Sequence, residues 1–420
     1  LTGDSDVDGD ALTITSINGE TINTSAGNQT ITVPNGIVTV TTAGAISFAP
    51  TANYNGSSTF AYVISDGNGE TATANQNITI TAVNDAPVAR PDVGNTNEDV
   101  TLSVTKANGL IDDNDTDIDA GDVLTVTKFV VDGVDVNVTP STAGSTLIAG
   151  KGTLTINSNG SYSFVPVLNF NGAIPQVMYT ISDGTNTANS TLDITVNPIN
   201  DAPVAVADSY TTNEDTAVTL TPLTGDSDVD GDALTITSIN GTLLTPGTLQ
   251  TITVSNGTVT VTAAGAISFA PVANYNGSST FAYVISDGNG ETATANQNIT
   301  ITAVNDAPVA RPDVGNTNED VTLSVIKANG LIDDNDTDID AGTTLNITSF
   351  VVAGGSPIAV TPTTAGSTLI AGKGTLTVNT DGSYTFVPVL NFNGTVPQVT
   401  YTVSDGTNTA NSTLDITVNP

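Results

Sequence analysis

The chain has 420 residues and a formal net charge of −36, from 43 acidic and 7 basic side chains. It contains no Cys, His or Trp, which excludes disulfides, Cys/His zinc sites and catalytic triads that need an imidazole base. A polyanion of this size is repelled by nucleic acid and by anionic lipid headgroups, and no apolar run approaches the ~20 residues of a membrane-spanning helix. We therefore expect no nucleic-acid partner and no membrane insertion, and we expect the chain to attract cations.

Repeats organise the whole sequence. Residues 52–104 recur letter for letter 221 residues later, as residues 273–325. The tetrapeptide Asn-Asp-Ala-Pro begins at Asn84, Asn200 and Asn305 and marks boundaries between units of ordinary domain size, ~100 residues. We therefore predict four domains, at 1–83, 84–199, 200–304 and 305–420. The first has no counterpart of the segment that opens the third, and a chain that begins at Leu1 without Met is expected to be a segment of a longer protein.

The predicted elements are short β-strands, most clearly in the third domain. Residues 250–264 form two alternating runs around an Asn-Gly pair, which favours a hairpin with a type I′ turn. Phe281, Tyr283 and Ile285 follow with a spacing of two, which predicts a strand that points these side chains inward. Residues 298–302 are predicted as the closing strand. Several short strands per ~100 residues predict an all-β fold with one β-sandwich in each domain.

Asp-rich loops carry much of the negative charge. The first and third domains contain Asp-Ser-Asp-Val-Asp-Gly-Asp, and the other two contain the variant Asp-Thr-Asp-Ile-Asp. These loops span residues 4–10, 226–232, 115–119 and 336–340. Carboxylates at alternate positions of a tight turn converge, and Ca²⁺, which takes about six to eight oxygen ligands, relieves their repulsion. The alternative is a solvated Asp-Gly turn that binds no metal.

The start of the loop resembles an EF-hand, but the rest does not. The twelfth position is Thr15 or Thr237 where an EF-hand has Glu, and strands are predicted on both sides where helices would be needed. We therefore reject an EF-hand.

A second acidic set recurs at fixed places in the repeats. Glu-Asp pairs follow the first predicted strand, at Glu98, Glu214 and Glu319. Ser-Asp-Gly occurs near the end of each domain, at Asp66, Asp183, Asp287 and Asp405. The order of Glu, Asp-x-Asp, Asp-Gly and an Asn-Asp-Ala-Pro linker resembles the cadherin-like repeats of large bacterial surface proteins, including the extender regions of RTX-type and gliding-type adhesins. The Asp-Arg-Glu element of cadherins is missing, and an Asn-Tyr-Asn-Gly or Asn-Phe-Asn-Gly segment stands near its place.

The resemblance implies a linear array of immunoglobulin-like (cadherin-like) β-sandwich domains, with Ca²⁺ bound between consecutive units. At the first junction the implied ligands are Asn84, Asp85, Asp117, Asp119 and Asp183. At the second they are Glu98, Asn200, Asp201, Asp228, Asp230 and Asp287. At the third they are Glu214, Asn305, Asp306, Asp338, Asp340 and Asp405, and the first domain offers Asp6, Asp8 and Asp66.

The resemblance also implies a function. It indicates a secreted protein of the bacterial cell surface: a Ca²⁺-stiffened stalk whose direct partners are neighbouring repeats and which projects a distal region that binds glycan or protein. The alternative is that these repeats bind glycan or a partner protein themselves, which ordinarily needs an exposed aromatic platform. Of the 10 Phe and 9 Tyr, all but Tyr210 recur at equivalent repeat positions with strand spacing, which favours a place in the core. No acidic pair is unique to one domain, so we expect no glycosidase or other enzymatic activity.

Overall fold

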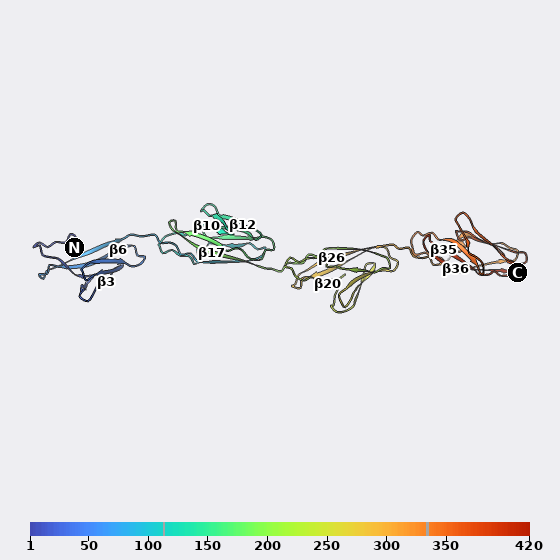
Figure 1. Ribbon diagram of the computed structural model, residues 1–420, viewed down its shortest axis with the longest axis horizontal. Coiled ribbons are helices and arrows are strands. Elements are labelled where there is room, and N and C mark those ends of the chain that lie inside the picture. The colour runs from blue at the N-terminus through green and yellow to red at the C-terminus, as the bar shows by residue number, and fades with distance from the viewer. Residues whose placement is uncertain (112–113, 333–335) are drawn as a thin grey trace. The chain divides into compact units, whose positions relative to one another are not determined.

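A computed structural model describes residues 1–111, 114–332 and 336–420. The chain divides into two compact units, Leu1–Ile199 and Asn200–Pro420, and each is described by itself. Each unit holds two pairs of β-sheets, whose strands can be followed in Figure 1. Each pair of sheets encloses its own cluster of buried apolar side chains. The fold is therefore all-β, as the sequence predicts, and consists of tandem sandwiches that we number first to fourth in chain order.

The strands of each sandwich are short. The first sandwich contains β1 (Thr13–Ile17), β2 (Glu20–Thr21), β3 (Gln29–Val33), β4 (Gly36–Val40), β5 (Ile46–Pro50), β6 (Gly56–Ser65) and β7 (Thr71–Ile80). The second contains β8 (Asp92–Asn97), β9 (Leu102–Val104), the 3₁₀ turn η1 (Lys106–Asn108), β10 (Thr125–Val131), β11 (Val134–Asn137), β12 (Gly144–Ile148), β13 (Gly152–Ile156), β14 (Tyr162–Pro166), β15 (Gly172–Ala173), β16 (Val177–Ser182) and β17 (Thr187–Asn197).

The second unit repeats this pattern. The third sandwich contains β18 (Asp208–Asn213), β19 (Val218–Leu220), β20 (Thr235–Ile239), β21 (Thr242–Leu243), β22 (Gln250–Val254), β23 (Gly257–Val261), β24 (Ile267–Pro271), β25 (Gly277–Ser286) and β26 (Thr292–Thr302). The fourth contains β27 (Asp313–Asn318), β28 (Leu323–Val325), the 3₁₀ turn η2 (Lys327–Asn329), β29 (Asn346–Val352), β30 (Ile358–Ala359), β31 (Gly366–Ile370), β32 (Gly374–Val378), β33 (Tyr384–Pro388), β34 (Gly394–Thr395), β35 (Val399–Ser404) and β36 (Thr409–Asn419). Among the described residues, no helix has the length and apolar character needed to cross a membrane.

The predicted hairpin of the third sandwich is confirmed, but its predicted turn type is wrong. β22 pairs with β23, and Val254 lies opposite Gly257 across a two-residue loop. A type I′ turn needs positive φ at both loop residues, whereas of Ser255 and Asn256 only Asn256 has it, at 56°. Gly257 already belongs to strand β23, and a side chain is excluded there because a Cβ would lie 2.3 Å from the Phe269 ring. The glycine therefore serves the core packing and not the turn.

Most aromatic side chains lie in the cores or pack against them, as predicted. Phe281, Tyr283 and Ile285 are 3%, 0% and 0% exposed, so they share the inward face of β25. In the described part of the chain, every Phe and Tyr side chain is at least partly buried. The residues 298–302 lie within β26, which also confirms the predicted closing strand.

In the second, third and fourth sandwiches the first strand lies parallel to the last. β18 pairs with β26 from Asp208 opposite Gln297 to Asn213 opposite Thr302. β8 pairs with β17 and β27 pairs with β36 in the same parallel manner. The short second strand then joins the other sheet, where β19 pairs antiparallel with β24. Two consecutive strands thus close one edge of both sheets.

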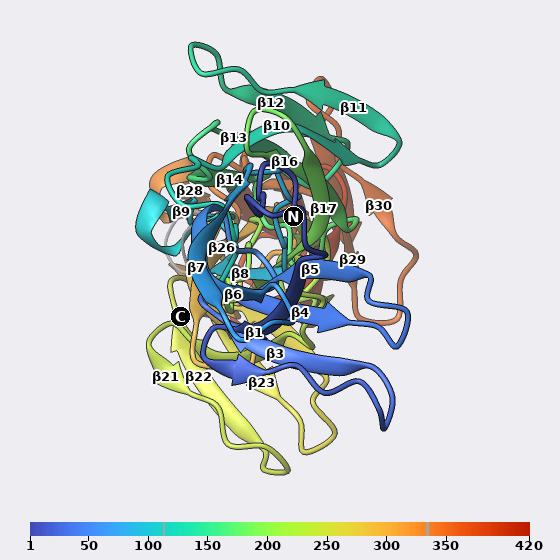
Figure 2. The same ribbon diagram turned by 90° about the vertical axis from the view of Figure 1, so that its left-hand side faces the viewer.

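The first sandwich has no such pair among the described residues. Its sheets run β2-β1-β6-β7 and β3-β4-β5, so the outer edges of β7 and β5 stay unpaired (β5 can be followed in blue in Figure 2). β7 and β26 share the sequence TATANQNITI, yet Gln76 of β7 is exposed whereas its counterpart Gln297 is fully buried. The difference arises because β26 is covered by β18.

We expect the first sandwich to open before the third in native-state hydrogen exchange, since edge amides of β7 lack the partner that protects β26. Peptides 71–80 and 292–301 have the same sequence and therefore the same mass. Their shared mass envelope should split into a fast-exchanging and a slow-exchanging population of equal size. A single envelope throughout the exchange would contradict the prediction.

Candidate metal centre

Each Asp-rich loop meets a Ser-Asp-Gly turn at one end of a sheet. The loops precede β1, β10, β20 and β29, and the turns follow β6, β16, β25 and β35. These strands pair antiparallel, with Thr13 opposite Ser65 and Thr235 opposite Ser286, so each loop and turn are neighbours. The linker joins them in the later sandwiches through isolated bridges of Val88 with Thr116, Val204 with Ser227 and Val309 with Thr337.

The linker holds both acidic elements by hydrogen bonds that recur in three sandwiches. The backbone N–H of the linker Asp donates to the second Asp of Asp-x-Asp: Asp85 to Asp119 at 2.6 Å, Asp201 to Asp230 at 2.8 Å and Asp306 to Asp340 at 2.8 Å. The side-chain amide of the linker Asn donates to the Asp of the turn: Asn84 to Asp183 at 2.9 Å, Asn200 to Asp287 at 2.6 Å and Asn305 to Asp405 at 2.8 Å. The fold therefore brings together the loop, turn and linker residues that the sequence analysis names as candidate ligands.

The first Asp of each Asp-x-Asp has one satisfied and one unsatisfied oxygen. Oδ1 of Asp117, Asp228 and Asp338 accepts the backbone N–H two residues later, at 2.8, 2.9 and 2.8 Å. Oδ2 of the same three residues is buried and has no hydrogen-bond partner. A buried carboxylate oxygen without a donor is costly, so the same orphan at equivalent positions of three sandwiches needs an explanation.

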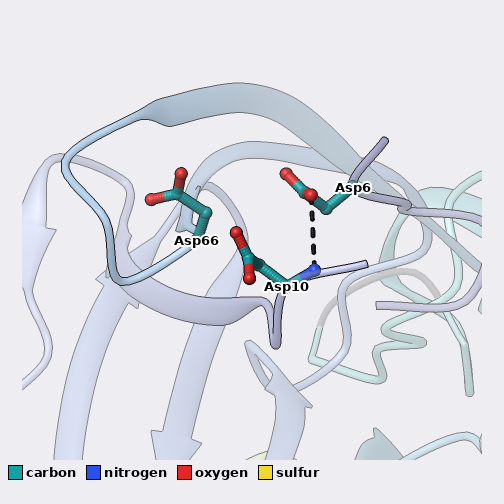
Figure 3. A group of neighbouring side chains, drawn as sticks. All are labelled: Asp6, Asp10 and Asp66. Atoms are coloured by element: carbon teal, nitrogen blue, oxygen red, sulfur yellow. Dashed lines mark hydrogen bonds between the residues drawn. The ribbon is translucent and has the colours of Figure 1, made fainter. Parts of the chain in front are cut away.

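Carboxylate oxygens from three Asp residues lie within 4.8 Å of one another in each of three sandwiches. The groups are Asp6, Asp10 and Asp66; Asp117, Asp119 and Asp122; and Asp228, Asp230 and Asp232. Figure 3 shows the first group, in which the N–H of Asp10 donates to Asp6 at 3.3 Å. Each group contains a member that the sequence does not predict as a ligand, namely Asp10, Asp122 or Asp232, and Asp8 lies outside the first group. The signal for the missed residues is the further Asp that follows each Asp-x-Asp-Gly or Asp-Ala-Gly segment.

Burial and the crowding of like charges both change the pKa of Asp122. Burial, followed by the charges of Asp117, Asp119 and Asp183, raises its pKa above the ordinary value of 3.8. In the fourth sandwich Thr343 stands at the position of Asp122, so one carboxylate fewer is available beside Asp338 and Asp340.

The turn carboxylates are held in the ionised form by hydrogen bonds. The pKa of Asp287 is lowered chiefly by the Asn200 amide, and also by N–H groups of its own turn, while its burial opposes the shift. For Asp183 the N–H of Thr185 makes the largest contribution to the lowered pKa. For Asp405 burial is the largest single influence and acts upward, but the N–H of Thr407 and the Asn305 amide outweigh it, so the pKa is again lowered. Each of these three turns therefore presents a negative oxygen at neutral pH.

The Glu-Asp pairs lie at the opposite end of their sandwiches. Glu214 is 4% exposed, and its Oε1 accepts the backbone N–H of Val304 at 2.6 Å. Asp215 accepts the backbone N–H of Asn274 at 2.9 Å. Asn274 opens the Asn-Tyr-Asn-Gly segment, so this segment anchors the Glu-Asp pair, a role that the sequence does not predict. In the second sandwich Glu98 accepts from Ile199, and Asp99 accepts from Asn169 at 2.9 Å.

Within the second unit these groups approach the next linker. The Asn274 amide, with its nitrogen toward the carboxylates, donates to Asp215 Oδ2 at 3.0 Å and to Asp306 Oδ2 at 3.3 Å. Burial raises the pKa of Asp306, and the charges of Asp340, Asp215, Glu214 and Asp338 add to the shift. Carboxylates from the third sandwich, the linker and the fourth sandwich thus converge on Asp306.

We expect Asp306→Asn to stabilise the metal-free chain at neutral pH. A folded-state pKa above the unfolded value means that this group favours folding below about pH 3.8 and that its contribution is lost as pH rises through the raised pKa. The variant should therefore melt at a higher temperature than the parent in EDTA at pH 7, and the difference should vanish near pH 3.5, below the ordinary pKa.

Asp381→Asn provides the control of opposite sign. The hydroxyl of Ser383 lowers the pKa of Asp381, so its ionised form favours folding and the variant should melt lower at pH 7. Melting temperatures from calorimetry between pH 3.5 and 7 check both, and a destabilised metal-free Asp306→Asn chain at pH 7 would contradict the prediction.

Two family models match consecutive parts of the chain. The bacterial Ig domain matches residues 1–79 and 200–300, and the bacterial cadherin-like domain matches residues 84–198 and 305–420. The second model alone matches more than half of the chain. Both are families of structural repeat domains. No curated protein matches the chain at a significant level.

Solved cadherin structures share the fold. Extracellular cadherin domains 1–5 of protocadherin gamma B2 align with 97% of this chain over 74% of their own length, at 13% identity and a TM-score of 0.55. The extracellular domain of protocadherin gammaB4 aligns with 98% of this chain at 13% identity and a TM-score of 0.50, and the chain spans 64% of its length. These likenesses concern the fold alone. By the match of its second and fourth repeats, the chain belongs to the bacterial cadherin-like domain family.

Proposed function

We propose that this chain is a Ca²⁺-binding structural region of a secreted bacterial cell-surface protein. The observation that carries the proposal is the buried, unpartnered Oδ2 of Asp117, Asp228 and Asp338. Each of these oxygens belongs to an Asp-x-Asp whose second Asp is held by the linker. A bound cation would satisfy the orphan oxygen and offset the repulsion among its neighbours.

The donor set suits Ca²⁺ better than softer metals. The chain offers carboxylates, Asn side chains and backbone carbonyls, and it has no Cys or His. In the first unit we propose Asn84, Asp85, Asp117, Asp119, Asp122 and Asp183 as the residues that hold the ion. In the second unit we propose Asn200, Asp201, Asp228, Asp230, Asp232 and Asp287, followed by Glu214, Asn305, Asp306, Asp338, Asp340 and Asp405.

The positions of these residues support a mechanical role. The linker, the Asp-x-Asp loop and the Ser-Asp-Gly turn would share one ion, so metal binding would fix the linker against the sandwich that follows it. We propose domains at 1–83, 84–199, 200–304 and 305–420, joined in this way into a stiffened stalk that projects the binding region of an adhesin. Neighbouring repeats are then its direct partners, and we propose no catalytic activity for it.

Calcium binding to the Asp228 site tests the proposal. Isothermal titration of the metal-free chain with Ca²⁺ measures the affinity of each site. Asp228→Asn should abolish Ca²⁺ binding at the site that contains it, or weaken that binding by at least about tenfold, because the site loses one negative ligand. Asp135→Asn, an exposed carboxylate of β11, is the matched control and should bind like the parent. At Ca²⁺ about 100-fold above Kd, binding to one site should add about 2.7 kcal/mol to the stability of the domain that holds it.

A gain-of-function variant sharpens the test. Thr343→Asp would restore to the fourth sandwich the carboxylate that Asp122 supplies in the second, and it should tighten binding there. If neither Asp228→Asn nor Thr343→Asp changes the titration, the Asp loops are solvated turns and the chain is not a calcium-binding stalk.

A further inference from the structure

An open groove lies along the unpaired edges of the first sandwich. It has a volume of about 520 Å³. Its apolar wall is formed by side chains of both sheets, including Ile46, Phe48, Phe60 and Ile78, and Gln76 adds a polar group. Leu1 and Thr2 line its remaining side. The groove therefore gives access to the core between β5 and β7.

The third sandwich shows what closes the equivalent space. There Gln297 and Ile299 pair with Asp208 and Tyr210 of β18, while Phe269 and Ile267 pair with Val218 and Leu220 of β19. The residues of the first sandwich that occupy these pairing positions, 221 residues earlier, are Gln76, Ile78, Phe48 and Ile46. All of them line the groove. The groove therefore occupies the position that the continuous segment β18–β19 fills in the third sandwich.

The side chains of the groove are exposed where their counterparts are covered. Ile46 is 43% exposed and Ile267 only 6%. Gln297 is fully buried, and its Nε2 donates to Asp208 Oδ2 at 2.6 Å, whereas the Gln76 side chain is exposed. Leu220 enters the core of the third sandwich and is 3% exposed. An occupant of the groove would therefore bury apolar surface, satisfy two sheet edges and bond Gln76.

We propose that this groove binds an extended polypeptide segment with the sequence pattern of Asp208–Leu220. Its first part would run parallel to β7, with an Asp beside Gln76 and an aromatic residue beside Ile78. Its second part would run antiparallel to β5, with Val and Leu beside Phe48 and Ile46. Main-chain hydrogen bonds along both edges would provide the affinity, and the alternate side chains would provide the specificity.

The geometry points to such a segment and not to a second copy of the chain. The two edges need one parallel and one antiparallel strand separated by a short connection, as between Asn213 and Val218. The described chain contains three segments with this arrangement, β8–β9, β18–β19 and β27–β28, and each is already paired within its own sandwich. A second copy could supply one only by opening a sandwich of its own.

Titration of the full chain with a synthetic peptide of residues 205–221 tests the proposal. The peptide should slow exchange of the β5 amides, which can be followed separately from those of β24 because Thr51 and Val272 distinguish the two peptide masses. It should also merge the two populations of the shared 71–80 envelope into the slow one. A peptide with Val218→Asp and Leu220→Asp should bind at least about tenfold more weakly, since both changes place a charge in the core.

Running the titration in Ca²⁺ and in EDTA separates this proposal from the calcium site, because protection of β5 and β7 should be the same in both. Unchanged exchange at saturating peptide would overturn it. So would protection of the same edges by concentration-dependent dimerisation without peptide, measured by light scattering, which would assign the groove to a second copy.

Discussion

Removing Ca²⁺ should reduce the maximum dimension of the chain in solution while leaving the sandwich cores folded. Without metal, the carboxylates of each Asp group repel one another within 4.8 Å, and the linkers would lose the ion that we propose they share. Each core is a cluster of packed apolar side chains, whose burial does not depend on a bound ion. Small-angle scattering in Ca²⁺ and then in EDTA measures the dimension, and circular dichroism on the same samples checks that the β structure persists.

A double variant localises this effect. Asp201→Asn with Asp228→Asn should reproduce part of the EDTA change in the presence of Ca²⁺, because only one linker and its loop are altered. Asp135→Asn should scatter like the parent in both buffers. Identical scattering curves of the parent in Ca²⁺ and EDTA would show that metal does not restrain the linkers.

Phe269→Ala should destabilise the third sandwich by about 3–5 kcal/mol, the usual cost of truncating a fully buried Phe. Phe269 is 0% exposed and its ring lies 6.1 Å from that of Phe281, centroid to centroid. The cavity would form between the two sheets, where the Phe269 ring of β24 stacks on Phe281 of β25. The free energy of opening from native-state hydrogen exchange of the β23 peptide measures the loss.

The matched variant is Phe48→Ala, the same residue of the first sandwich. The Phe48 ring stacks on Phe60 at 6.3 Å in the same way, but it borders the open groove and is only partly buried. Its truncation should therefore cost less than that of Phe269, followed on the β4 peptide. Equal losses at the two sites would contradict the view that the edge strands make the difference.

Two segments of identical sequence form the same kind of strand here but differ in how deeply their side chains are buried. Residues 71–80 and 292–301 alternate in the same way, and both form a strand paired to the preceding one, as a period of two predicts. Burial differs because it depends on β18, whose residues lie 89 positions before their partners in β26, as Asp208 does before Gln297. Local pattern therefore predicts the element, and only the sheet order shows which of its faces is covered.

The residues of the candidate site likewise divide into those that local motifs predict and those that only the fold reveals. Asp-x-Asp, Ser-Asp-Gly and Asn-Asp are local motifs, and the sequence predicts that they act together. Asp232 escapes prediction because Gly231, at a φ of 81°, turns the loop back and places the Asp232 N–H against Asp228. The contact of Asn274 with Asp215 spans 59 residues and has no local signal at all.

The parallel pairing of the first and last strands has a consequence for mechanical load. When a domain is pulled by its two ends, neighbouring parallel terminal strands slide past each other, so the bonds between β18 and β26 must break together. An antiparallel terminal pair would instead unzip one bond at a time. Tension applied to the second, third and fourth sandwiches is thus resisted by a six-residue register in each. The first sandwich, in which the outer edge of β7 has no partner strand, would yield at lower force unless a strand occupies that edge.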